Sequence, residues 1–333
     1  MSHEAIAVLG AGSWGTALAI QFARAGRDTM LWGRNADHLK ELRDARENAQ
    51  YLPGAEFPER LAVQADLASA VATRRDILVS VPSHAFRECL RQVRPLLRED
   101  ARVAWATKGF ELDTGKLPHQ VANEELGEDM PKAVLSGPTF AKEVGSGLPT
   151  AMTVASADPV FARDLAEELS SERFRAYMSS DVIGVEVGGA VKNVLAIGAG
   201  LSDGLGFGAN TRTALITRGL VEMTRLGLAL GGERDTFMGL AGMGDLMLTC
   251  TDNQSRNRRM GLALAAGKTV QEAEREIQQV VEGVKAARAV WEVASNLGVE
   301  MPICEQIYRI IYEGAEPAHA VRALMTRQLK SEG

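Results

Sequence analysis

Four polar residues in the C-terminal half could together bind a small anionic ligand. The segment GLAGMGDLMLTCTDNQSRN, residues 239–257, sets one acid, Asp245, shortly before Ser255, Arg256 and Asn257 in a glycine-rich frame. Glycines let backbone amides approach a ligand, and a guanidinium forks onto phosphate or carboxylate oxygens. The pattern indicates a ligand with hydroxyls at one end and an anion at the other. The alternative is a polar loop between two helices.

A lysine inside an apolar stretch is a second candidate for chemistry. Lys192 and Asn193 lie within EVGGAVKNVLAIGAG, residues 186–200, which has the small apolar residues of a buried helix. Lysine is seldom buried unless it is paired, and desolvation lowers the pKa of an ammonium group toward the range where it exchanges a proton. We expect Asp245 to be the counter-charge of Lys192. The alternative is a lysine whose stem reaches out to solvent.

A glycine-rich turn near the N-terminus indicates a dinucleotide site. An apolar run ends at Leu9 and is followed by GAGSWG, residues 10–15, and then by a helical pattern. In this motif the first glycine makes the tight turn, the second admits a pyrophosphate to the backbone, and the third lets the helix pack on the strand. Strand, turn and helix in this order make a common motif specific. The residues expected to meet the cofactor are Gly10, Gly12, Ser13, Trp14 and Gly15.

The end of the next apolar run decides which nicotinamide nucleotide fits. Residues 31–35, LWGRN, carry Arg34 and no acid, whereas an acid here would pair with a free ribose 2′-hydroxyl. An arginine in this place stacks on adenine and pairs with a 2′-phosphate. We therefore predict acceptance of NADP(H) and disfavour strict NAD specificity. The alternative is a solvated arginine at the end of a strand.

Two later strand ends also carry polar residues. Lys108 stands in TKGF, residues 107–110, and Gly137 and Thr139 stand in SGPTFA, residues 136–141. Ligands collect at the carboxyl ends of the strands in open α/β sheets. We expect Lys108 to meet cofactor or substrate, and Gly137 and Thr139 to hydrogen-bond substrate. An ordinary surface lysine is the alternative for Lys108.

The elements that must position these residues change type along the chain. In the first half, short β-branched runs alternate with amphipathic stretches, which predicts a mostly parallel sheet with helices on both faces. After Ser180 the runs are long and spaced at helical intervals, which predicts a largely helical second half. We place the join near Gly188 and expect domains at 1–187 and 188–333. The expected strands are residues 5–9, 29–32, 77–81, 102–106, 133–136 and 151–155.

Composition excludes several classes of protein. The 333 residues are 46% hydrophobic and 24% charged, which allows two domains with well-filled cores. A net charge of -6 argues against nucleic acid or an anionic membrane surface as the main partner. Three scattered cysteines, and histidines without metal-ligand spacing, indicate neither a disulfide framework nor a metal site. The first apolar run is too short for a signal peptide or a spanning helix, so we expect a cytoplasmic protein without membrane insertion.

In this order, the motifs resemble bacterial-type NAD(P)-dependent sn-glycerol-3-phosphate dehydrogenase over most of the chain. The resemblance rests on GAGSWG, TKGF, SGPTFA, VKNVLA, GDL and SRN, at residues 10–15, 107–110, 136–141, 191–196, 244–246 and 255–257. It implies an α/β Rossmann dinucleotide-binding domain followed by an all-helical domain of the 6-phosphogluconate dehydrogenase type. It also implies a cytoplasmic homodimer that interconverts dihydroxyacetone phosphate and sn-glycerol 3-phosphate with NADP(H) or NAD(H), without a metal, and supplies glycerophospholipid synthesis.

The resemblance also implies a role for each matching position. Lys192 becomes the proton acceptor in alcohol oxidation, while hydride moves between the nicotinamide and C2 of the substrate. The implied substrate contacts are Lys108, Gly137, Thr139, Lys192, Asp245, Ser255, Arg256 and Asn257. The implied cofactor contacts are Ser13, Trp14, Arg34, Lys108, Ala141, Arg256, Val280 and Glu282. Val280 and Glu282 rest on the family pattern alone.

Two other functions remain as alternatives. One is a reductase of the same two-domain plan that acts on a hydroxy acid such as 6-phosphogluconate or ketopantoate, which would also use a lysine carried by a helix. The Ser-Arg-Asn cluster after Gly244-Asp-Leu argues against it. The other is a nucleotide sensor without catalysis, whose second domain binds a partner protein. The presence of Lys192, Asp245 and Arg256 together argues against that one.

Overall fold

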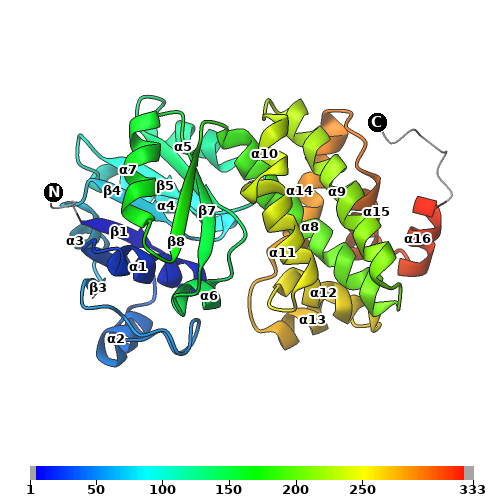
Figure 1. Cartoon of the computed structure of the whole chain (residues 1–333), viewed down its shortest axis with the longest axis horizontal. Helices are drawn as coiled ribbons and strands as arrows, with labels where there is room; N and C mark the ends of the chain where they lie inside the picture. Colours follow the sequence, from blue (N-terminus) through cyan, green and yellow to red (C-terminus); the bar gives the residue numbers. More distant parts are fainter. Residues whose placement is uncertain (1–4, 326–333) are drawn as a thin grey trace. The chain divides into compact units, whose positions relative to one another are not determined.

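The computed structural model describes residues 5–325 and divides them into two compact units. Unit 1 comprises residues 5–111 together with Lys116–Glu186. Unit 2 comprises Leu112–Gly115 and the described residues from Val187 onward. Unit 1 holds the sheet and unit 2 is helical (Figure 1). Each unit therefore has its own set of packed elements.

The sheet of unit 1 has eight strands in the order β3-β2-β1-β4-β5-β6-β7-β8. All neighbouring strands pair in parallel except β6 and β7, which are antiparallel, so the expectation of a mostly parallel sheet is confirmed. The strands are β1 (Ile6–Leu9), β2 (Thr29–Trp32), β3 (Leu61–Gln64), β4 (Asp76–Val79), β5 (Arg102–Trp105), β6 (Lys132–Ser136), β7 (Thr150–Ala155) and β8 (Phe174–Ser179).

Sequence patterning missed the two edge strands, β3 and β8. Four of the six residues of β8 are charged or polar or lie exposed, and β3 is fully buried only at Leu61. An edge strand has one open side and needs fewer apolar residues, so its pattern resembles a loop. The expected central strands are present, with ends that differ by one or two residues.

The helices of unit 1 lie on both faces of the sheet (Figure 1). From β1 the chain crosses through α1 to β2, and from β4 it crosses through α4 to β5 in the opposite direction along the sheet. Because such crossovers are right-handed, α1 and α4 cover opposite faces. The carboxyl ends of β1 and β4 therefore form a topological switch point, the place where open α/β sheets generally bind ligands. The helices are α1 (Ser13–Arg24), α2 (Ala36–Ala45), α3 (Leu67–Val71), α4 (Ser83–Val93), η1 (Arg94–Leu96), α5 (Pro118–Leu126), α6 (Ala141–Gly145) and α7 (Pro159–Leu169).

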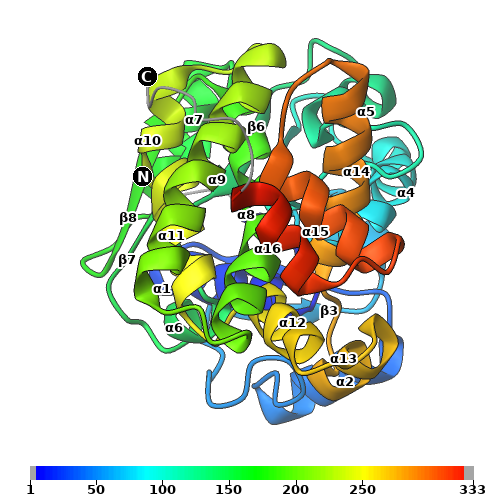
Figure 2. The same cartoon turned by 90° about the vertical axis from the view of Figure 1, so that its right-hand side faces the viewer.

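Unit 2 is built from helices around α8 (Val182–Gly204), whose first residues belong to unit 1 (Figure 2). This helix is long and apolar enough to cross a membrane, but 89% of its most apolar window is buried inside the structure, as in the core helix of a soluble protein. The other helices are α9 (Ala209–Ala229), α10 (Arg234–Met238), η2 (Leu240–Gly244), α11 (Asp245–Thr251), α12 (Arg256–Ala265), α13 (Val270–Ile277), α14 (Glu282–Asn296), α15 (Pro302–Tyr312) and α16 (Pro317–Met325).

The small residues of α8 let neighbouring backbones approach it closely. A Cβ added at Gly188 would lie 2.4 Å from the carbonyl oxygen of Ala241, and one added at Gly200 would lie 2.0 Å from that of Arg258. Both distances are far below contact, so larger side chains would push η2 and α12 away from α8. The composition of α8 thus sets how near its polar residues come to the neighbouring helices.

Candidate functional site

The glycine turn of unit 1 has the shape of a dinucleotide cradle. Gly10 has φ of +124°, and a Cβ on it would lie 2.2 Å from the carbonyl oxygen of Ser80 at the end of β4. A Cβ on Gly15 would lie 1.9 Å from the carbonyl oxygen of Gly10, so only glycine lets α1 begin this close to β1. By contrast, a Cβ on Gly12 would meet no atom within 4 Å. The middle glycine therefore faces open space where a ligand can approach the backbone.

The start of α1 fits an anion. Within the described part of the chain, no side chain caps this helix, and its first turn, which begins with Ser13 and Trp14, contains no acid. The first backbone N–H groups of a helix have no partner inside the helix, and the helix dipole adds positive potential there. A pyrophosphate supplies the missing acceptors and the negative charge. The residues present thus fit a dinucleotide.

The other predicted contacts of unit 1 lie at strand ends on the same edge. Arg34 is exposed and follows β2, and Lys108 follows β5 and precedes Gly109, whose φ is +99°. Gly137 follows β6 with φ of +150°, and the Thr139 hydroxyl donates to the Gly137 carbonyl at 3.3 Å. Ala141 begins α6, which packs against α1. The sheet topology brings these positions to one edge because β2, β5 and β6 all run parallel to β1.

In unit 2, Lys192 and Asp245 form a buried ion pair. Nζ of Lys192 lies 2.5 Å from Oδ1 of Asp245, and the two residues are 7% and 1% exposed. The expected counter-charge is confirmed, and the lysine does not reach out to solvent. Nζ also donates to the Thr249 hydroxyl at 3.2 Å, and this hydroxyl donates to the Asp245 carbonyl at 2.6 Å. Each partner is held in place by more than one bond.

Thr249 is a neighbour of the Lys192–Asp245 pair that the sequence motifs did not indicate. It stands four residues after Asp245 on α11, and residues at this spacing share one face of a helix. The spacing was available in the sequence, but a threonine in a helix is common and gave no signal by itself. Next to it, burial raises the pKa of Cys250 to about 12, although Lys192 and Arg258 act in the opposite direction. Cys250 therefore stays a neutral thiol beside the ion pair.

Asp245 is presented by an unusual piece of backbone. Residues Leu240–Gly244 form a π-helical turn, η2, and Asp245 begins α11 directly after it. Such turns are rare and occur often at functional sites. A Cβ on Gly242 would lie 2.3 Å from the carbonyl oxygen of Phe237, so the turn needs glycine at this point. The glycine-rich sequence before Asp245 builds this turn rather than a loop.

The Ser-Arg-Asn cluster forms the start of α12. The hydroxyl of Ser255 caps the helix by accepting the backbone N–H of Arg258 at 3.2 Å. Arg256 is the first residue of the helix and is partly exposed, whereas Ser255 and Asn257 are buried. The helix dipole and the Arg256 guanidinium both favour an anion at this end. Only residues 252–255 lie outside a helix between α11 and α12, so the segment 240–257 is mostly helical and not one polar loop.

Asn257 links three helices through its side-chain amide. Its Nδ2 donates to Oδ1 of Asn193 on α8 at 2.8 Å, and its Oδ1 accepts the backbone N–H of Gly283 on α14 at 2.8 Å. Glu282 is the first residue of α14, and Val280, just before it, is 48% exposed. The structure thus brings Asn257 next to Asn193 and to the start of α14.

The buried side chain of Arg258 links the start of α12 to α8 and to the end of α11. It is buried, pairs with Asp203 of α8 at 2.6 Å, and donates to the Cys250 carbonyl at 3.2 Å and to Asn253 Oδ1 at 3.0 Å. Burial opposes ionisation of Asp203, but hydrogen bonds from Arg212 and Arg258 outweigh it and hold the pKa of Asp203 below its usual value. The link between α11 and α12 is therefore fastened to α8.

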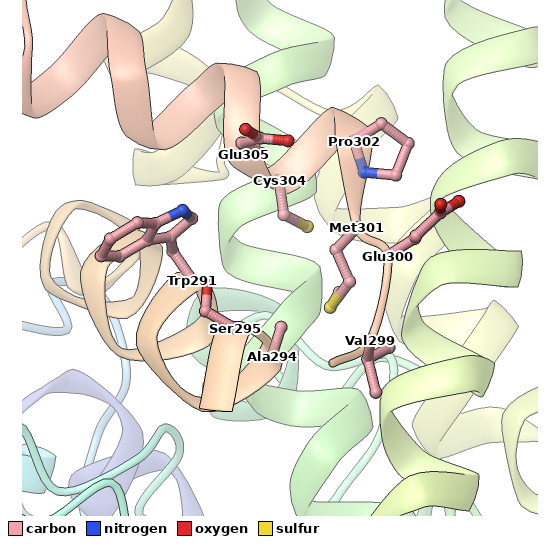
Figure 3. A pocket seen from close by; sticks show the side chains of 9 residues that line it. All are labelled: Trp291, Ala294, Ser295, Val299, Glu300, Met301, Pro302, Cys304 and Glu305. Atoms are coloured by element: carbon pink, nitrogen blue, oxygen red, sulfur yellow. The ribbon is translucent and has the colours of Figure 1, made fainter. Parts of the chain in front are cut away.

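A separate pocket in unit 2 lies between α14 and α15. It has a volume of about 270 Å³, and Trp291, Met301 and Cys304 are among its lining side chains (Figure 3). None of the predicted substrate or cofactor residues lines it. We therefore do not assign the substrate to this pocket. Among residues 5–325, no group of three or more His, Cys, Asp or Glu side chains could hold a metal ion.

Comparison with known families accounts for both units. Residues 5–162 match the family described as NAD-dependent glycerol-3-phosphate dehydrogenase N-terminus, and residues 181–322 match the corresponding C-terminus. The chain belongs to the NAD-dependent glycerol-3-phosphate dehydrogenase family. Membership supports an oxidoreductase with a nicotinamide cofactor, and the Rossmann domain followed by a helical domain is confirmed. The hydroxy-acid reductase and the sensor lose their support.

Individual members of the family match almost end to end. Glycerol-3-phosphate dehydrogenase [NAD(P)+] of Shewanella frigidimarina is 58% identical over 328 residues, which covers 98% of this chain and 97% of that protein. The enzyme of the same name from Klebsiella pneumoniae is 57% identical over 331 residues, with 99% and 98% covered. The crystal structure of glycerol-3-phosphate dehydrogenase from Coxiella burnetii has a TM-score of 0.95 at 48% identity, and covers 98% of this chain and 100% of that one.

Proposed function

We propose that this protein is an NAD(P)-dependent sn-glycerol-3-phosphate dehydrogenase that reduces C2 of dihydroxyacetone phosphate. The observation that carries the proposal is the buried Lys192–Asp245 pair, which stands on helices of the family's C-terminal domain. A lysine held in this way can exchange a proton with an alcohol oxygen. Bound NAD(P)H supplies the hydride to C2.

Lys192 is the proposed acid and base of the reaction. Reduction of the ketone places negative charge on the C2 oxygen. The Lys192 ammonium stabilises that charge and donates a proton to the oxygen. In the reverse direction the neutral amine accepts the proton. Positioned acid–base catalysis of this kind contributes about 10²–10⁴ in rate. Asp245 and Thr249 hold Nζ in one place, so little reorganisation is needed during the reaction.

The substrate phosphate is assigned to the start of α12. Arg256, the N-terminal amides of the helix and the partial positive charge there suit a dianion. Ser255 and Asn257 keep this end of the helix in shape and are proposed as substrate contacts beside Arg256. The phosphate is remote from C2, so its binding energy serves to orient the reacting carbon. Lys108, Gly137 and Thr139 are proposed as further substrate contacts on the family pattern.

The cofactor is assigned to the glycine turn and its neighbours. Gly10, Gly12 and Gly15 admit the pyrophosphate, and Arg34 meets the adenosine end, which favours acceptance of NADP(H) beside NAD(H). The remaining proposed cofactor contacts are Ser13, Trp14, Lys108, Ala141, Arg256, Val280 and Glu282. We further propose a cytoplasmic homodimer without membrane insertion that supplies glycerol 3-phosphate for glycerophospholipid synthesis. Within each subunit, the proposed domains are residues 1–187 and 188–333.

One assay tests the function. The purified protein is given NADPH or NADH with dihydroxyacetone phosphate, and oxidation of the nucleotide is followed by absorbance. We expect oxidation with dihydroxyacetone phosphate and none with ketopantoate or dihydroxyacetone, which lack its phosphate. Reduction of a keto acid, with no response to dihydroxyacetone phosphate, would overturn the proposal.

A further inference from the structure

The segment that carries Lys108 is joined at both ends to one buried carboxylate. Trp105, the last residue of β5, donates its indole N–H to Oε1 of Glu186 at 2.9 Å. His119, in the first turn of α5, donates its backbone N–H to the same oxygen at 2.9 Å. The ring nitrogen Nδ1 of His119 lies 2.5 Å from the other oxygen, Oε2. Glu186 thus closes residues 106–118 into a loop whose two ends are held together.

Burying Glu186 carries a cost that packing alone does not explain. The residue is 4% exposed, and burial raises the pKa of its carboxyl group even though hydrogen bonds from His119 and Trp105 act in the opposite direction. An apolar side chain of similar volume would fill the same space without desolvating a charge. A carboxylate at this position therefore has a further role, and its three bonds show which elements it joins.

The interior of the loop is fixed at further points. The Thr107 hydroxyl donates to the Val81 carbonyl at 2.7 Å, and the Glu111 carboxylate accepts two bonds from Arg87, at 2.7 and 2.8 Å. Lys108 stands between the Thr107 bond and the turn at Gly109. The end at Trp105 is held in the sheet, because β5 pairs with β4 and β6. The end at His119 has no such ladder, and Glu186 links it to Trp105.

Glu186 also stands on the helix that carries Lys192. Both residues belong to α8, and the helix is continuous from Val182 to Gly204. If Glu186 moved away from Trp105 and His119, the Lys108 loop would lose its link between the two ends. The first turns of α8 would shift at the same time. One carboxylate has direct bonds to the loop and a covalent connection to the helix of the proposed acid and base.

We propose that Glu186 is a positioning residue for the reaction, acting through Trp105 and His119 to hold the loop that presents Lys108. The inference rests on the role of Lys108 given under the proposed function. Loss of the Glu186 carboxylate moves Lys108 away from its working position. It removes no group that touches substrate or cofactor. Misplacement of a binding group by about 1 Å costs on the order of a hundredfold in rate.

Two substitutions at Glu186 separate positioning from folding. Glu186→Gln keeps an oxygen that accepts the N–H groups of Trp105 and His119, so we expect kinetics close to those of the wild type. Glu186→Leu fills the space but accepts nothing. We expect it to raise KM for dihydroxyacetone phosphate and lower kcat/KM about ten- to a hundredfold. We also expect faster amide hydrogen exchange in residues 106–118, and nearly unchanged binding of 2′,5′-ADP, a fragment of NADP that lacks the nicotinamide.

A second buried carboxylate provides the matched control. Glu222 is 2% exposed and accepts the backbone N–H groups of Ile303 and Cys304 at the start of α15, far along the chain from the Lys108 loop. Glu222→Leu should lower the melting temperature as Glu186→Leu does, while leaving KM, kcat and exchange in residues 106–118 unchanged. Equal kinetic effects of the two leucine variants would overturn the proposal.

A cycle with Lys108→Ala tests the route of the effect. If Glu186 acts by placing Lys108, the two substitutions together should cost little more than Lys108→Ala alone, whereas independent effects would multiply. Multiplied effects, or a Glu186→Leu enzyme with wild-type kinetics, would contradict the inference. If Glu186→Leu does not fold, Trp105→Phe removes one of the three bonds and should show the same changes in part. The exchange measurement needs no substrate, so it tests the loop even if the proposed function fails.

Discussion

Nζ of Lys192 lies 2.5 Å from Oδ1 of Asp245, although the two residues are 53 positions apart and almost fully buried. A buried ion pair is seldom a source of net stability, because desolvation offsets much of the attraction. This pair is therefore better explained by chemistry than by folding. The hydroxyl of Thr249, which contacts both partners, adds a third fixed point. The pair is the place in unit 2 that we propose for proton exchange with the substrate.

Replacing Lys192 should remove turnover and leave nucleotide binding intact. For Lys192→Ala we expect a fall in kcat of about 10²–10⁴-fold, because the acid–base step and its positive charge are lost together. Binding of NADPH, measured by fluorescence or calorimetry, should stay near normal. The exposed Lys268, replaced in the same way, should leave kcat unchanged. Turnover close to that of the wild type would contradict the assigned role.

Replacing Asp245 alone should destabilise the protein strongly. Asp245→Ala leaves the Lys192 ammonium buried without its carboxylate, which costs about 3–5 kcal/mol in the free energy of unfolding. The double variant Lys192→Met with Asp245→Ala should lose less than the sum of the single variants, because no charge remains unpaired. Urea denaturation measures both. A loss below about 1 kcal/mol for Asp245→Ala would indicate that the pair is not buried as described.

Arg256 should matter for the phosphate of the substrate. Arg256→Ala is expected to raise KM for dihydroxyacetone phosphate at least about tenfold, the effect of one lost hydrogen bond to a charged group. The proposed cofactor contact of Arg256 would add a smaller change in KM for NADPH. Arg218, which is exposed on α9, provides the control, since Arg218→Ala should change neither constant. An unchanged KM for dihydroxyacetone phosphate would remove Arg256 from the site.

Arg34 should set the preference between the two nucleotides. Arg34→Asp places an acid at the end of β2, where it repels a 2′-phosphate and can accept a free ribose hydroxyl. We expect kcat/KM for NADPH to fall about tenfold or more and the value for NADH to rise. The ratio of the two values is the measurement. A ratio that does not move would place the 2′-phosphate elsewhere.

Glu222 should make stability depend on pH. Burial raises the pKa of Glu222 to about 7 from 4.5, even though the backbone N–H groups of Ile303 and Cys304 favour the ionised form. In the folded protein the group holds its proton to higher pH than in the unfolded chain. Its contribution is thus fully present below about pH 4.5 and lost as pH rises through about 7.

The measurement for Glu222 compares unfolding of the wild type and of Glu222→Gln from pH 4.5 to 8. At each pH the free energy of unfolding is obtained by urea denaturation. The wild type should lose up to roughly 3 kcal/mol more than the variant as pH rises over this range. Parallel curves for the two proteins would show that Glu222 does not titrate in this way.

Motifs and patterning in the sequence determined the local pieces of this protein. The GAGSWG turn, the buried central strands, the lysine in an apolar helix and the Ser-Arg-Asn cluster depend on neighbours along the chain, because glycine geometry and hydrophobic period act over a few residues. The pairing of Lys192 with Asp245 could also be predicted, since a buried ammonium requires a counter-charge and Asp245 stands in the other polar motif.

Only the tertiary structure decided what depends on packing between distant segments. The edge strands β3 and β8 form because a neighbouring strand supplies hydrogen bonds, which no pattern of their own announces. The π-helical turn before Asp245, the hydroxyl of Thr249 against Nζ, and the amide of Asn257 between Asn193 and Gly283 arise where small residues let backbones approach. This close approach of backbones determines which side chains far apart in sequence become partners. No short segment of the sequence contains that information.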